Sequence, residues 1–252
     1  TWTRPATMSP TARPMTDLHW LSAGDPPDSF PDPKSALSEP DGLLAVGGDL
    51  SPERLLAAYR HGIFPWFNAD QPILWWSPNP RAVLLPNELH VSRSLRRRLR
   101  RDDYRVSADQ CFGRVIDACA QRRRDEGTWI TPEMRLAYCK LHELGFAHSI
   151  ETWREDELVG GLYGVNIGRV FFGESMFSRR TDASKVALVA LVGLGKPMGL
   201  ELIDCQLASS HLASLGSRLV PRERFLELLE RYCAFPSPSS WQQGQMETSA
   251  LA

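Results

Sequence analysis

The stretch SIETWREDELVGGLYGVNIGRVFFGESMFS, residues 149–178, decides the fold class of this chain. Its three apolar runs are rich in β-branched and aromatic residues and are separated by short polar or glycine-containing turns, which predicts three consecutive strands. An apolar segment from Val186 to Leu194 follows, with Asp182 placed to begin it, and predicts a helix. Beyond it the pattern predicts a strand over residues 200–206, a short helix near 210–216 and an amphipathic helix over 221–233. The chain is therefore expected to be of the mixed α/β class.

The order of these elements, three strands, one crossover helix, a strand and a helix, is similar to that of acetyltransferase-like (GNAT) folds. Upstream, apolar spacing and helix-capping residues predict helices over residues 51–61, 92–101 and 131–144 and a short strand over 81–86. We therefore expect an α/β (α+β) chain in which a small N-terminal domain, 29–90, precedes an acetyltransferase-like catalytic domain, 91–235. Residues 1–28 and 236–252 contain few apolar residues, and we expect them to be a mobile N-terminal tail and a loose C-terminal tail.

The 252 residues, 42% of them hydrophobic and 23% charged, have the composition of an ordinary soluble globular protein. The five cysteines show no C-x-x-C spacing, which argues against a zinc ribbon or a disulfide framework and favours reduced thiols. The longest apolar run, Val186 to Gly195, is about half as long as a membrane span. No signal-peptide pattern opens the sequence. We therefore expect a cytoplasmic protein that does not enter a membrane.

A local cluster of arginines stands out, because the formal net charge of the whole chain is only −1. The segment SRSLRRRLRRDDYR, residues 92–105, carries seven arginines, and a second cluster follows at 122–124. Arginine contacts to phosphates position a nucleic acid without reading its sequence. The helix predicted over 92–101 is therefore either a nucleic-acid-binding surface or a solvated charged face. Its candidate phosphate-binding side chains are Arg93, Arg96, Arg97, Arg98, Arg100 and Arg101.

Two acidic residues lie in apolar strands. Asp204 and Gln206 are two positions apart in one predicted strand, so both side chains leave the same face of the sheet, and Cys205 should face the opposite side, in the core. A buried aspartate is costly unless it is hydrogen-bonded or used. Asp204 therefore caps the next helix, pairs with an arginine or belongs to a ligand site at the strand end. Glu174 either pairs with a basic residue such as Arg179 or receives a cationic amine at the edge of an apolar pocket.

Several common kinds of site are not indicated. The six histidines have no metal-like spacing, and no serine lies in a G-x-S-x-G motif, so neither a metal site nor a serine hydrolase is expected. Enzymes of the acetyltransferase fold hold the pyrophosphate of coenzyme A with a glycine-containing loop ahead of the long helix. Here that position reads RRTDASK, residues 179–185, without a glycine. A coenzyme A donor is therefore disfavoured.

The segment FPWFNADQPILWWSPNPRA, residues 64–82, holds three of the eight tryptophans and four prolines. The prolines prevent a continuous helix and interrupt any central strand, so we expect a folded loop or an edge strand. Trp75 and Trp76 either pack in the core beneath it or help to form a rigid wall for a bulky apolar ligand.

Eight blocks of the sequence carry a resemblance to a known family: EPDGLLAVGGDLSPERLLAAYRHGIFPWF, PILWWSPNPRAVL, EGTWIT, LHELGFAHSIETW, ELVGGLYGV, FFGESMFSR, DASK and LIDCQ. Together and in this order they closely resemble bacterial leucyl/phenylalanyl-tRNA-protein transferases, over roughly three quarters of the chain. The resemblance implies an enzyme that takes Leu or Phe, and Met less well, from aminoacyl-tRNA. It would join this residue to a protein that begins with Arg or Lys and so mark that protein for degradation. Aminoacyl-tRNA would replace acyl-coenzyme A, so no cofactor and no metal are expected, and we expect a monomer.

The resemblance also implies roles for individual residues. The pocket for the donor side chain would include Trp66, Trp129 and Phe171. Two tyrosines, Tyr59 and Tyr138, would lie near the adenosine of the donor. The polar residues around the reacting centre would be Glu174, Asp204 and Gln206. Trp75 and Trp76 would support Trp66. The chain departs from the family in the helix after DASK, where Leu191 and Gly195 stand in place of pocket aromatics. We therefore expect a pocket floor of altered shape.

These matches lead to a hypothesis for the chemistry. Asp204, directly or through Gln206, would orient and deprotonate the attacking amine, while Glu174 would position the donor's amino group or the basic acceptor. Alternatively, Asp204 would only orient the amine, and the vicinal hydroxyl of the donor's 3′-terminal adenosine would move the proton. Two alternatives stay open. One is an aminoacyl-tRNA-dependent transferase that acts on another amine, such as a peptidoglycan bridge, and the other is a tRNA-binding module without catalytic activity.

Overall fold

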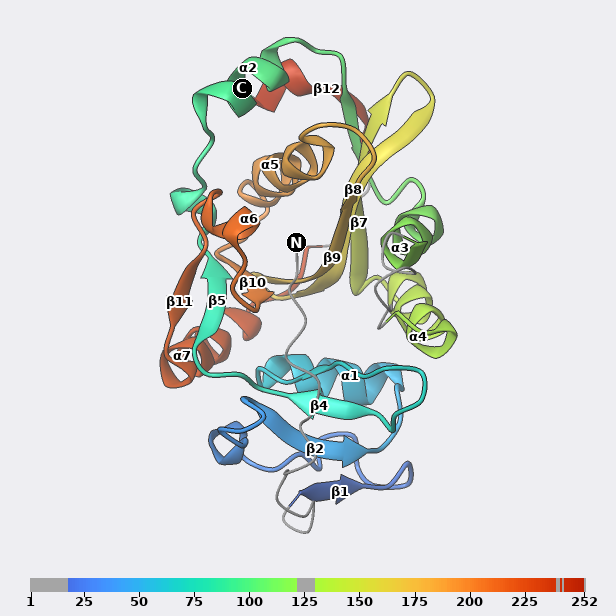
Figure 1. Cartoon of the computed structure of the whole chain (residues 1–252), viewed down its shortest axis with the longest axis vertical. Helices are drawn as coiled ribbons and strands as arrows, with labels where there is room; N and C mark the ends of the chain where they lie inside the picture. The colour runs from blue at the N-terminus through green and yellow to red at the C-terminus, as the bar shows by residue number, and fades with distance from the viewer. Residues whose placement is uncertain (1–17, 122–129, 239–240, 242, 252) are drawn as a thin grey trace.

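Two β-sheets lie one beyond the other along the long axis of the molecule (Figure 1). The computed structural model describes residues 18–121, 130–238, 241 and 243–251. Within them the smaller sheet has four strands, in the order β1 (His19–Leu21), β2 (Leu43–Gly47), β4 (Leu74–Trp76) and β3 (Phe64–Pro65). The larger sheet has eight, in the order β11 (Arg218–Val220), β5 (Arg81–Leu84), β10 (Leu202–Gln206), β9 (Val170–Ser178), β8 (Glu157–Ile167), β7 (Ala147–Arg154), β6 (Arg105–Ala108) and β12 (Gln243–Glu247).

Helices surround both sheets. The α-helices are α1 (Pro52–Arg60), α2 (Arg93–Arg100), α3 (Phe112–Gln121), α4 (Pro132–Glu143), α5 (Ala183–Gly195), α6 (Ser210–Ala213) and α7 (Arg222–Cys233). Short 3-10 helices are η2 (Pro33–Ser35), η3 (Pro86–Glu88) and η5 (Thr248–Leu251). In the part of the chain that the structure describes, none of these helices combines the length and the apolar character that a bilayer span requires.

The centre of the larger sheet agrees with the sequence prediction. β7, β8 and β9 are antiparallel neighbours, and β10 pairs parallel with β9 after α5 has crossed over the sheet. The helix lies close to β8 because Gly160 has no side chain: a Cβ there would lie 2.5 Å from the Cβ of Ala183. Asp182 precedes the helix in a left-handed conformation, φ 64°, but its side chain makes no capping hydrogen bond, contrary to its expected role.

Two hydrophobic cores lie on the two faces of the larger sheet. One, which we call the α4 face, is covered by α1, α3, α4, α7 and the smaller sheet; the other, the α5 face, is covered by α2, α5 and α6. Neighbouring residues of one strand alternate between them, as a pleated strand requires. In β10, for example, Leu202 packs on the α4 face and Ile203 on the α5 face.

The first described residues are not a mobile tail, in contrast to the sequence expectation for residues 1–28. β1 pairs parallel with β2, and Arg54 of α1, 1% exposed, donates hydrogen bonds to the carbonyl oxygens of Ser22, Asp25 and Pro26. A buried guanidinium has to find acceptors, and these backbone oxygens satisfy it. Residues 1–17 lie outside the described part of the chain.

The described residues near the C-terminus also contradict the expectation of a loose tail from 236 onward. β12 pairs with β6, and Trp241 is 3% exposed, with its indole nitrogen donating to Asn166 Oδ1 at 3.2 Å. Thr248 Oγ1 donates to the carbonyl oxygen of Leu99, near the end of α2, at 2.9 Å. This segment therefore completes one edge of the larger sheet and holds α2 in place.

The change from one sheet to the other comes earlier in the chain than the expected domain boundary at residue 90. β4 still belongs to the smaller sheet, whereas β5, beginning at Arg81, already lies within the larger one. The two segments are joined by the short link Ser77–Pro80. The sequence pattern does not show this division, because β5 is held by its neighbours β10 and β11, which are distant in sequence.

Candidate active site

The site forms where β9 and β10 separate. Their parallel pairing runs from Val170 opposite Leu202 to Phe172 opposite Asp204 and ends there. β10 then pairs only with β5, through a register shift that sets Gln206 opposite Ala82, while β9 continues along β8. A gap therefore opens between the two strands just beyond Asp204.

Asp204 forms a fully buried ion pair with Arg81 of β5. Arg81 Nε donates to Asp204 Oδ1 at 2.8 Å and Nη2 donates to Oδ2 at 2.7 Å, while the two residues are 1% and 0% exposed. Both carboxylate oxygens are thus occupied by a two-pronged, charge-assisted contact. Of the interpretations left open by the sequence, pairing with an arginine describes the observed contact.

Arg81 is the residue of this site that the sequence reasoning missed. Its guanidinium lies 4.7 Å from the ring centroids of both Phe64 and Phe225, and Nη1 donates to the carbonyl oxygen of Gly62 at 3.1 Å. Gly62 closes the turn after α1, so Arg81 joins β5, β10 and the end of α1. The available signal was an arginine at the start of the apolar run RAVL in the short strand predicted over 81–86, since a charge that becomes buried in such a strand needs a partner.

Gln206 is held in an uncommon backbone conformation by Asp204. Its φ is +60°, a region that residues other than glycine rarely adopt, and its backbone N–H donates to Asp204 Oδ1 at 2.9 Å. Strained residues of this kind gather at functional sites, where surrounding contacts hold them. The conformation directs the side chain across the gap, and Gln206 Nε2 donates to Glu174 Oε1 at 3.0 Å.

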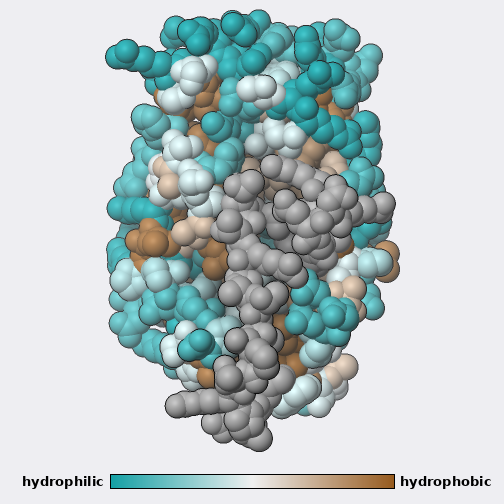
Figure 2. All heavy atoms as spheres, in the orientation of Figure 1, coloured by the Kyte–Doolittle hydropathy of each residue, from teal (hydrophilic) through white to brown (hydrophobic). Residues whose placement is uncertain are grey.

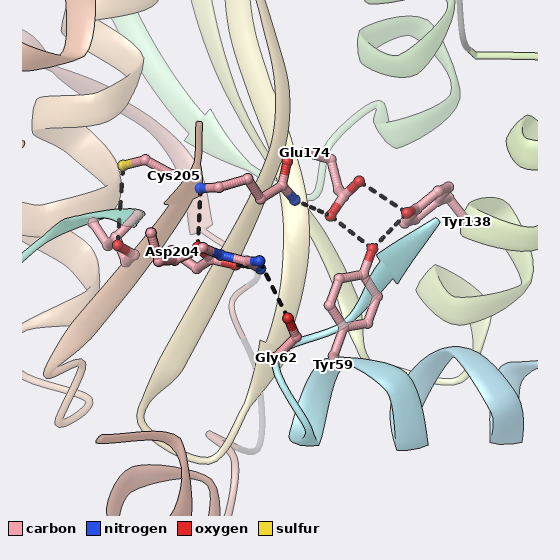
Figure 3. A network of polar contacts seen from close by, with 9 residues as sticks. Tyr59, Gly62, Tyr138, Glu174, Asp204 and Cys205 are labelled. Atoms are coloured by element: carbon pink, nitrogen blue, oxygen red, sulfur yellow. Dashed lines mark hydrogen bonds and ion pairs between the residues drawn. The ribbon is translucent and has the colours of Figure 1, made fainter. Parts of the chain in front are cut away.

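Glu174 accepts hydrogen bonds from three side chains. Besides Gln206, Tyr59 of α1 donates to Oε1 at 2.6 Å and Tyr138 of α4 donates to Oε2 at 2.8 Å, as Figure 3 shows. Glu174 is also the extra residue of a bulge in β9, because Gly173 and Ser175 pair with the consecutive residues Gly164 and Tyr163 of β8. Bulges next to active sites redirect side chains in this way.

Burial sets the proton affinity of this carboxylate. Glu174 is 3% exposed, and its desolvation, opposed by the hydrogen bonds from the tyrosines and Gln206, raises its pKa to about 7. The expected partner Arg179 instead donates to the carbonyl oxygen of Leu158, and within the described residues no cation forms an ion pair with Glu174. Burial and the nearby carboxylate also raise the pKa of Tyr59 and Tyr138 well above the usual tyrosine range. The two phenols therefore stay protonated and act as donors.

An apolar cavity of about 30 Å³ borders the gap, mostly on the α5 face. Its apolar lining includes Leu162, Phe171, Met176, Leu188, Leu191, Ile203 and Leu212. Cys205, on the side of β10 opposite to Asp204 as expected, also borders it, and burial raises the pKa of its thiol beyond the physiological range. We call the hydrogen-bonded side chains of Asp204, Gln206 and Glu174 the acidic network. This network and the apolar cavity meet where β9 and β10 separate.

The residues expected to form the donor pocket are only partly brought together. Phe171 and Leu191 line the cavity, whereas Trp66 is not among its lining residues and Trp129 lies outside the described part of the chain. Gly195 also does not line the cavity: a Cβ there would lie 2.5 Å from Leu200 and 3.2 Å from Trp241. The missing side chain at 195 therefore makes room for the C-terminal tryptophan.

The tryptophans of the smaller sheet have separate roles. Trp75 is fully buried and its indole nitrogen donates to the carbonyl oxygen of Gly47 at 2.8 Å. Trp76 donates to the carbonyl oxygen of Trp66 at 2.7 Å, and the two rings meet edge to face with centroids 5.7 Å apart. Trp66 itself is half-buried. Trp75 therefore belongs to the core, and Trp76 supports Trp66.

The arginine helix lies at the opposite end of the molecule from the smaller sheet (Figure 1). Only Leu95 and Leu99 of α2 are buried, and Arg93, Arg96, Arg97, Arg100 and Arg101 are exposed. Arg98 is half-buried and pairs with Asp103 at 2.7 Å. As for metals, no group of three or more His, Cys, Asp or Glu side chains within the described residues has the arrangement of a metal site.

Two protein-family models match the sequence of this chain. The family model of leucyl/phenylalanyl-tRNA protein transferase matches residues 83–230, and that of its N-terminal domain matches residues 48–79. The point between the two matches coincides with the change of sheet described above.

Curated relatives match most of the chain. A leucyl/phenylalanyl-tRNA--protein transferase of Stutzerimonas stutzeri (strain A1501) is 57% identical over 225 residues, which cover 89% of this chain and 99% of that protein. That of Nitrosospira multiformis is 60% identical over 215 residues, 84% of this chain and 91% of the relative.

Among solved structures, that of L-PGS from Bacillus licheniformis has a TM-score of 0.38 and 14% identity, covering 64% of this chain and 52% of the other. That likeness is too low to define a shared fold. The sequence matches are decisive by contrast: the chain belongs to the leucyl/phenylalanyl-tRNA protein transferase family.

Proposed function

We propose that this chain moves Leu or Phe, and Met less well, from aminoacyl-tRNA to the N-terminal Arg or Lys of a protein, and so forms a degradation signal. One observation supports this function above all: the apolar cavity and the buried Glu174, with a pKa of about 7, meet at the gap between β9 and β10. The cavity suits an apolar side chain, and the carboxylate suits an amine. The protein would act in the cytoplasm as a monomer and without a cofactor.

We further propose that the larger sheet and its helices form an acetyltransferase-like domain. Three antiparallel strands, a crossover helix and a parallel strand that separates from its neighbour support this assignment. In place of a glycine loop, the turn before α5 has the left-handed Asp182, and Ser178 Oγ accepts from the N–H of Ser184 at 3.2 Å. One N–H of the first turn, which could otherwise bind a phosphate, is thus already used.

The donor's side chain would occupy the cavity beside Phe171. Most of the residues that line this cavity are apolar, which suits the side chain of leucine or phenylalanine. Met176 borders the cavity, and its unbranched side chain adapts readily to donors of different shape. Leu191, in place of an aromatic residue, should favour a larger donor side chain. Trp66 would contact the donor outside the cavity, and Tyr59 and Tyr138 would act near the adenosine through Glu174.

In the reaction the acceptor's amine nitrogen bonds to the ester carbonyl carbon, and the bond from that carbon to the ribose oxygen breaks. The amine loses one proton and the ribose oxygen gains one. A carboxylate with a pKa of about 7 can accept and return this proton near neutral pH, so we assign that role to Glu174. Gln206 can accept a hydrogen bond from the amine through its amide oxygen while its N–H donates to Glu174.

Asp204 then serves as a positioning residue for Gln206. Its two oxygens accept from Arg81 and from the backbone of Gln206, and it is fully buried. Both oxygens of the carboxylate are thus already engaged as acceptors, and neither is left to take a proton from the attacking amine. This arrangement favours action through Gln206 over direct deprotonation by Asp204.

The exposed arginines of α2 would contact the phosphates of the tRNA. Figure 2 shows a largely hydrophilic surface at the end of the molecule where Figure 1 places this helix. η5 braces the helix, because Thr248 and Ser249 contact Leu99 and Asp102 at its C-terminal end. A braced cationic face suits a rigid, highly charged partner.

Neutralising three of these arginines should weaken tRNA binding. In the triple variant Arg96→Gln/Arg97→Gln/Arg100→Gln, the plot of log binding constant against log salt should flatten by about 2, since each lost phosphate contact contributes about 0.7 to 0.9. Filter binding of Phe-tRNA over a range of salt measures this. The matched control removes three exposed cations that lie outside α2, Lys34 of η2 and Arg224 and Arg231 of α7. If both triple variants changed the slope of the salt dependence equally, α2 would be a solvated charged face and not a tRNA-binding surface.

A transfer assay tests the function as a whole. The purified chain is incubated with Leu-, Phe- or Met-tRNA and with peptides that begin with Arg, Lys or Ala, and mass spectrometry follows the products. We expect addition of Leu and Phe, and less of Met, to the Arg and Lys peptides alone. Transfer to the Ala peptide or to another amine would favour a different acceptor class. Binding of tRNA without a new peptide bond would identify a binding module.

A further inference from the structure

The hydroxyl of Ser175 is a buried polar group that makes no hydrogen bond to any described residue. Ser175 is 5% exposed, and its Oγ has neither a donor nor an acceptor within reach in the described part of the chain. Burying a hydroxyl without a partner costs free energy, and such groups in native proteins call for an explanation, a catalytic role among them. By contrast, the buried hydroxyls of Ser107 and Ser149 in the same sheet both donate to Glu151.

The position of Ser175 coincides with the proposed reaction centre. It follows Glu174 directly at the bulge in β9, and it borders the apolar cavity together with Gly173 and Cys205. If the donor's side chain occupies this cavity and its reacting end faces Glu174 and Gln206, the ester lies at the level of residues 174 and 175. Ser175 is thus a polar residue at the point where the wall of the apolar cavity meets the hydrogen-bonded side chains of Glu174 and Gln206.

The chemistry of the ester selects one contact for this hydroxyl. The donor has two polar groups beside the reacting carbon, an amine and a carbonyl oxygen. The amine finds acceptors in Glu174 and in the amide oxygen of Gln206. The carbonyl oxygen only accepts, and it becomes negatively charged when the tetrahedral intermediate forms, so it needs a donor. A hydroxyl whose proton is not already committed can supply one without first breaking another bond.

We propose that Ser175 Oγ donates a hydrogen bond to the carbonyl oxygen of the aminoacyl ester and stabilises the oxyanion, which makes Ser175 a further catalytic residue. This inference rests on the proposed transfer function. The attacking nitrogen bonds to the carbonyl carbon, and the π electron pair moves onto the oxygen that Ser175 holds. That pair re-forms the carbonyl as the ribose oxygen leaves, and the serine keeps its own proton throughout.

Replacing Ser175 with alanine should lower kcat for Phe transfer to an Arg peptide about 100-fold, as expected for one lost oxyanion donor, with KM for Phe-tRNA little changed. The melting temperature should stay the same or rise, because the variant removes a hydroxyl that has no partner. Ser175→Thr, which keeps the hydroxyl, should recover activity, whereas the nearly isosteric Ser175→Cys, a poor donor, should not. The matched control Ser149→Ala should lower the melting temperature but keep kcat, since that hydroxyl serves Glu151.

Each result bears on the inference. A selective fall in kcat with unchanged stability and rescue by threonine supports it. Full activity of Ser175→Ala beside an active wild type would overturn it and leave the transfer function intact. A rise in KM alone would also overturn it, since the contact would then serve binding. An inactive wild type would overturn the transfer function and this inference together.

Discussion

Replacing Arg81 with methionine should lower the free energy of unfolding by about 3 to 5 kcal/mol and abolish aminoacyl transfer. The reason is that Asp204, 0% exposed, would be left as a buried charge without its cation. Arg81 also fixes the position of the Asp204 carboxylate, which accepts a hydrogen bond from the backbone N–H of Gln206. Without Arg81, Gln206 would therefore no longer be held in place. Urea unfolding measures the stability, and peptide modification with Phe-tRNA measures the activity.

A double variant separates stability from catalysis. Arg81→Met/Asp204→Leu should recover most of the lost stability, because replacing both members of a buried ion pair with apolar residues is often neutral. It should stay inactive, since nothing then holds Gln206 at φ +60°. The stability of Arg81→Lys should lie between that of the wild type and that of Arg81→Met, because lysine keeps the charge but cannot make the two parallel contacts to Asp204. A single Arg81→Met variant as stable as the wild type would contradict this account of the pair.

Glu174→Gln should lower the turnover of Phe transfer by about 1,000-fold, within the range expected for loss of a general base. The pH profile gives a second readout. The ionised carboxylate accepts the proton, and its pKa is about 7, so kcat of the wild type should rise from acid pH and level off above about pH 8. Residual activity of the variant should lack this rise. Single-turnover kinetics at several pH values measures both effects.

Glu151→Gln is a matched control for this prediction. Glu151 lies on β7, two strands away from β9, is fully buried, and its desolvation also raises its pKa. Its carboxylate accepts from Ser107 and Ser149, outside the proposed site. The control should change stability but keep turnover and its pH profile. Equal losses of turnover in both variants would mean that Glu174 acts through the stability of the sheet alone.

Patterns local in the sequence predict the central elements well. β7, β8, β9 and α5 follow from alternation and apolar runs, and α1, α2 and α4 begin where Ser51, Ser92 and Thr131 stand. By contrast, β1, β2, β6, β11 and β12 have at most five residues each and were missed. For the segment that holds β3 and β4 the expectation was a folded loop or an edge strand, and β3 is an edge strand of the smaller sheet. Such short strands persist only because partners distant in sequence pair with them.

The site shows the same division. Residue type and the resemblance single out Glu174, Asp204, Gln206, Tyr59 and Tyr138, and the structure brings all five together. The contacts that set their roles were not predictable in this way. Arg81 lies 123 positions from Asp204, and Tyr59 lies 115 from Glu174. A single sequence contains no signal for which of its arginines or tyrosines meets a given acid.

By itself, then, the amino-acid sequence determined the class of fold, the family resemblance and the list of chemically able residues, because each depends on local patterns. Only the tertiary structure decided that Asp204 is neutralised by Arg81 while Glu174 is held by two phenols and an amide. The physical reason is that the charge state of a buried carboxylate depends on its desolvation and on the partners around it, and the folded chain alone assembles both.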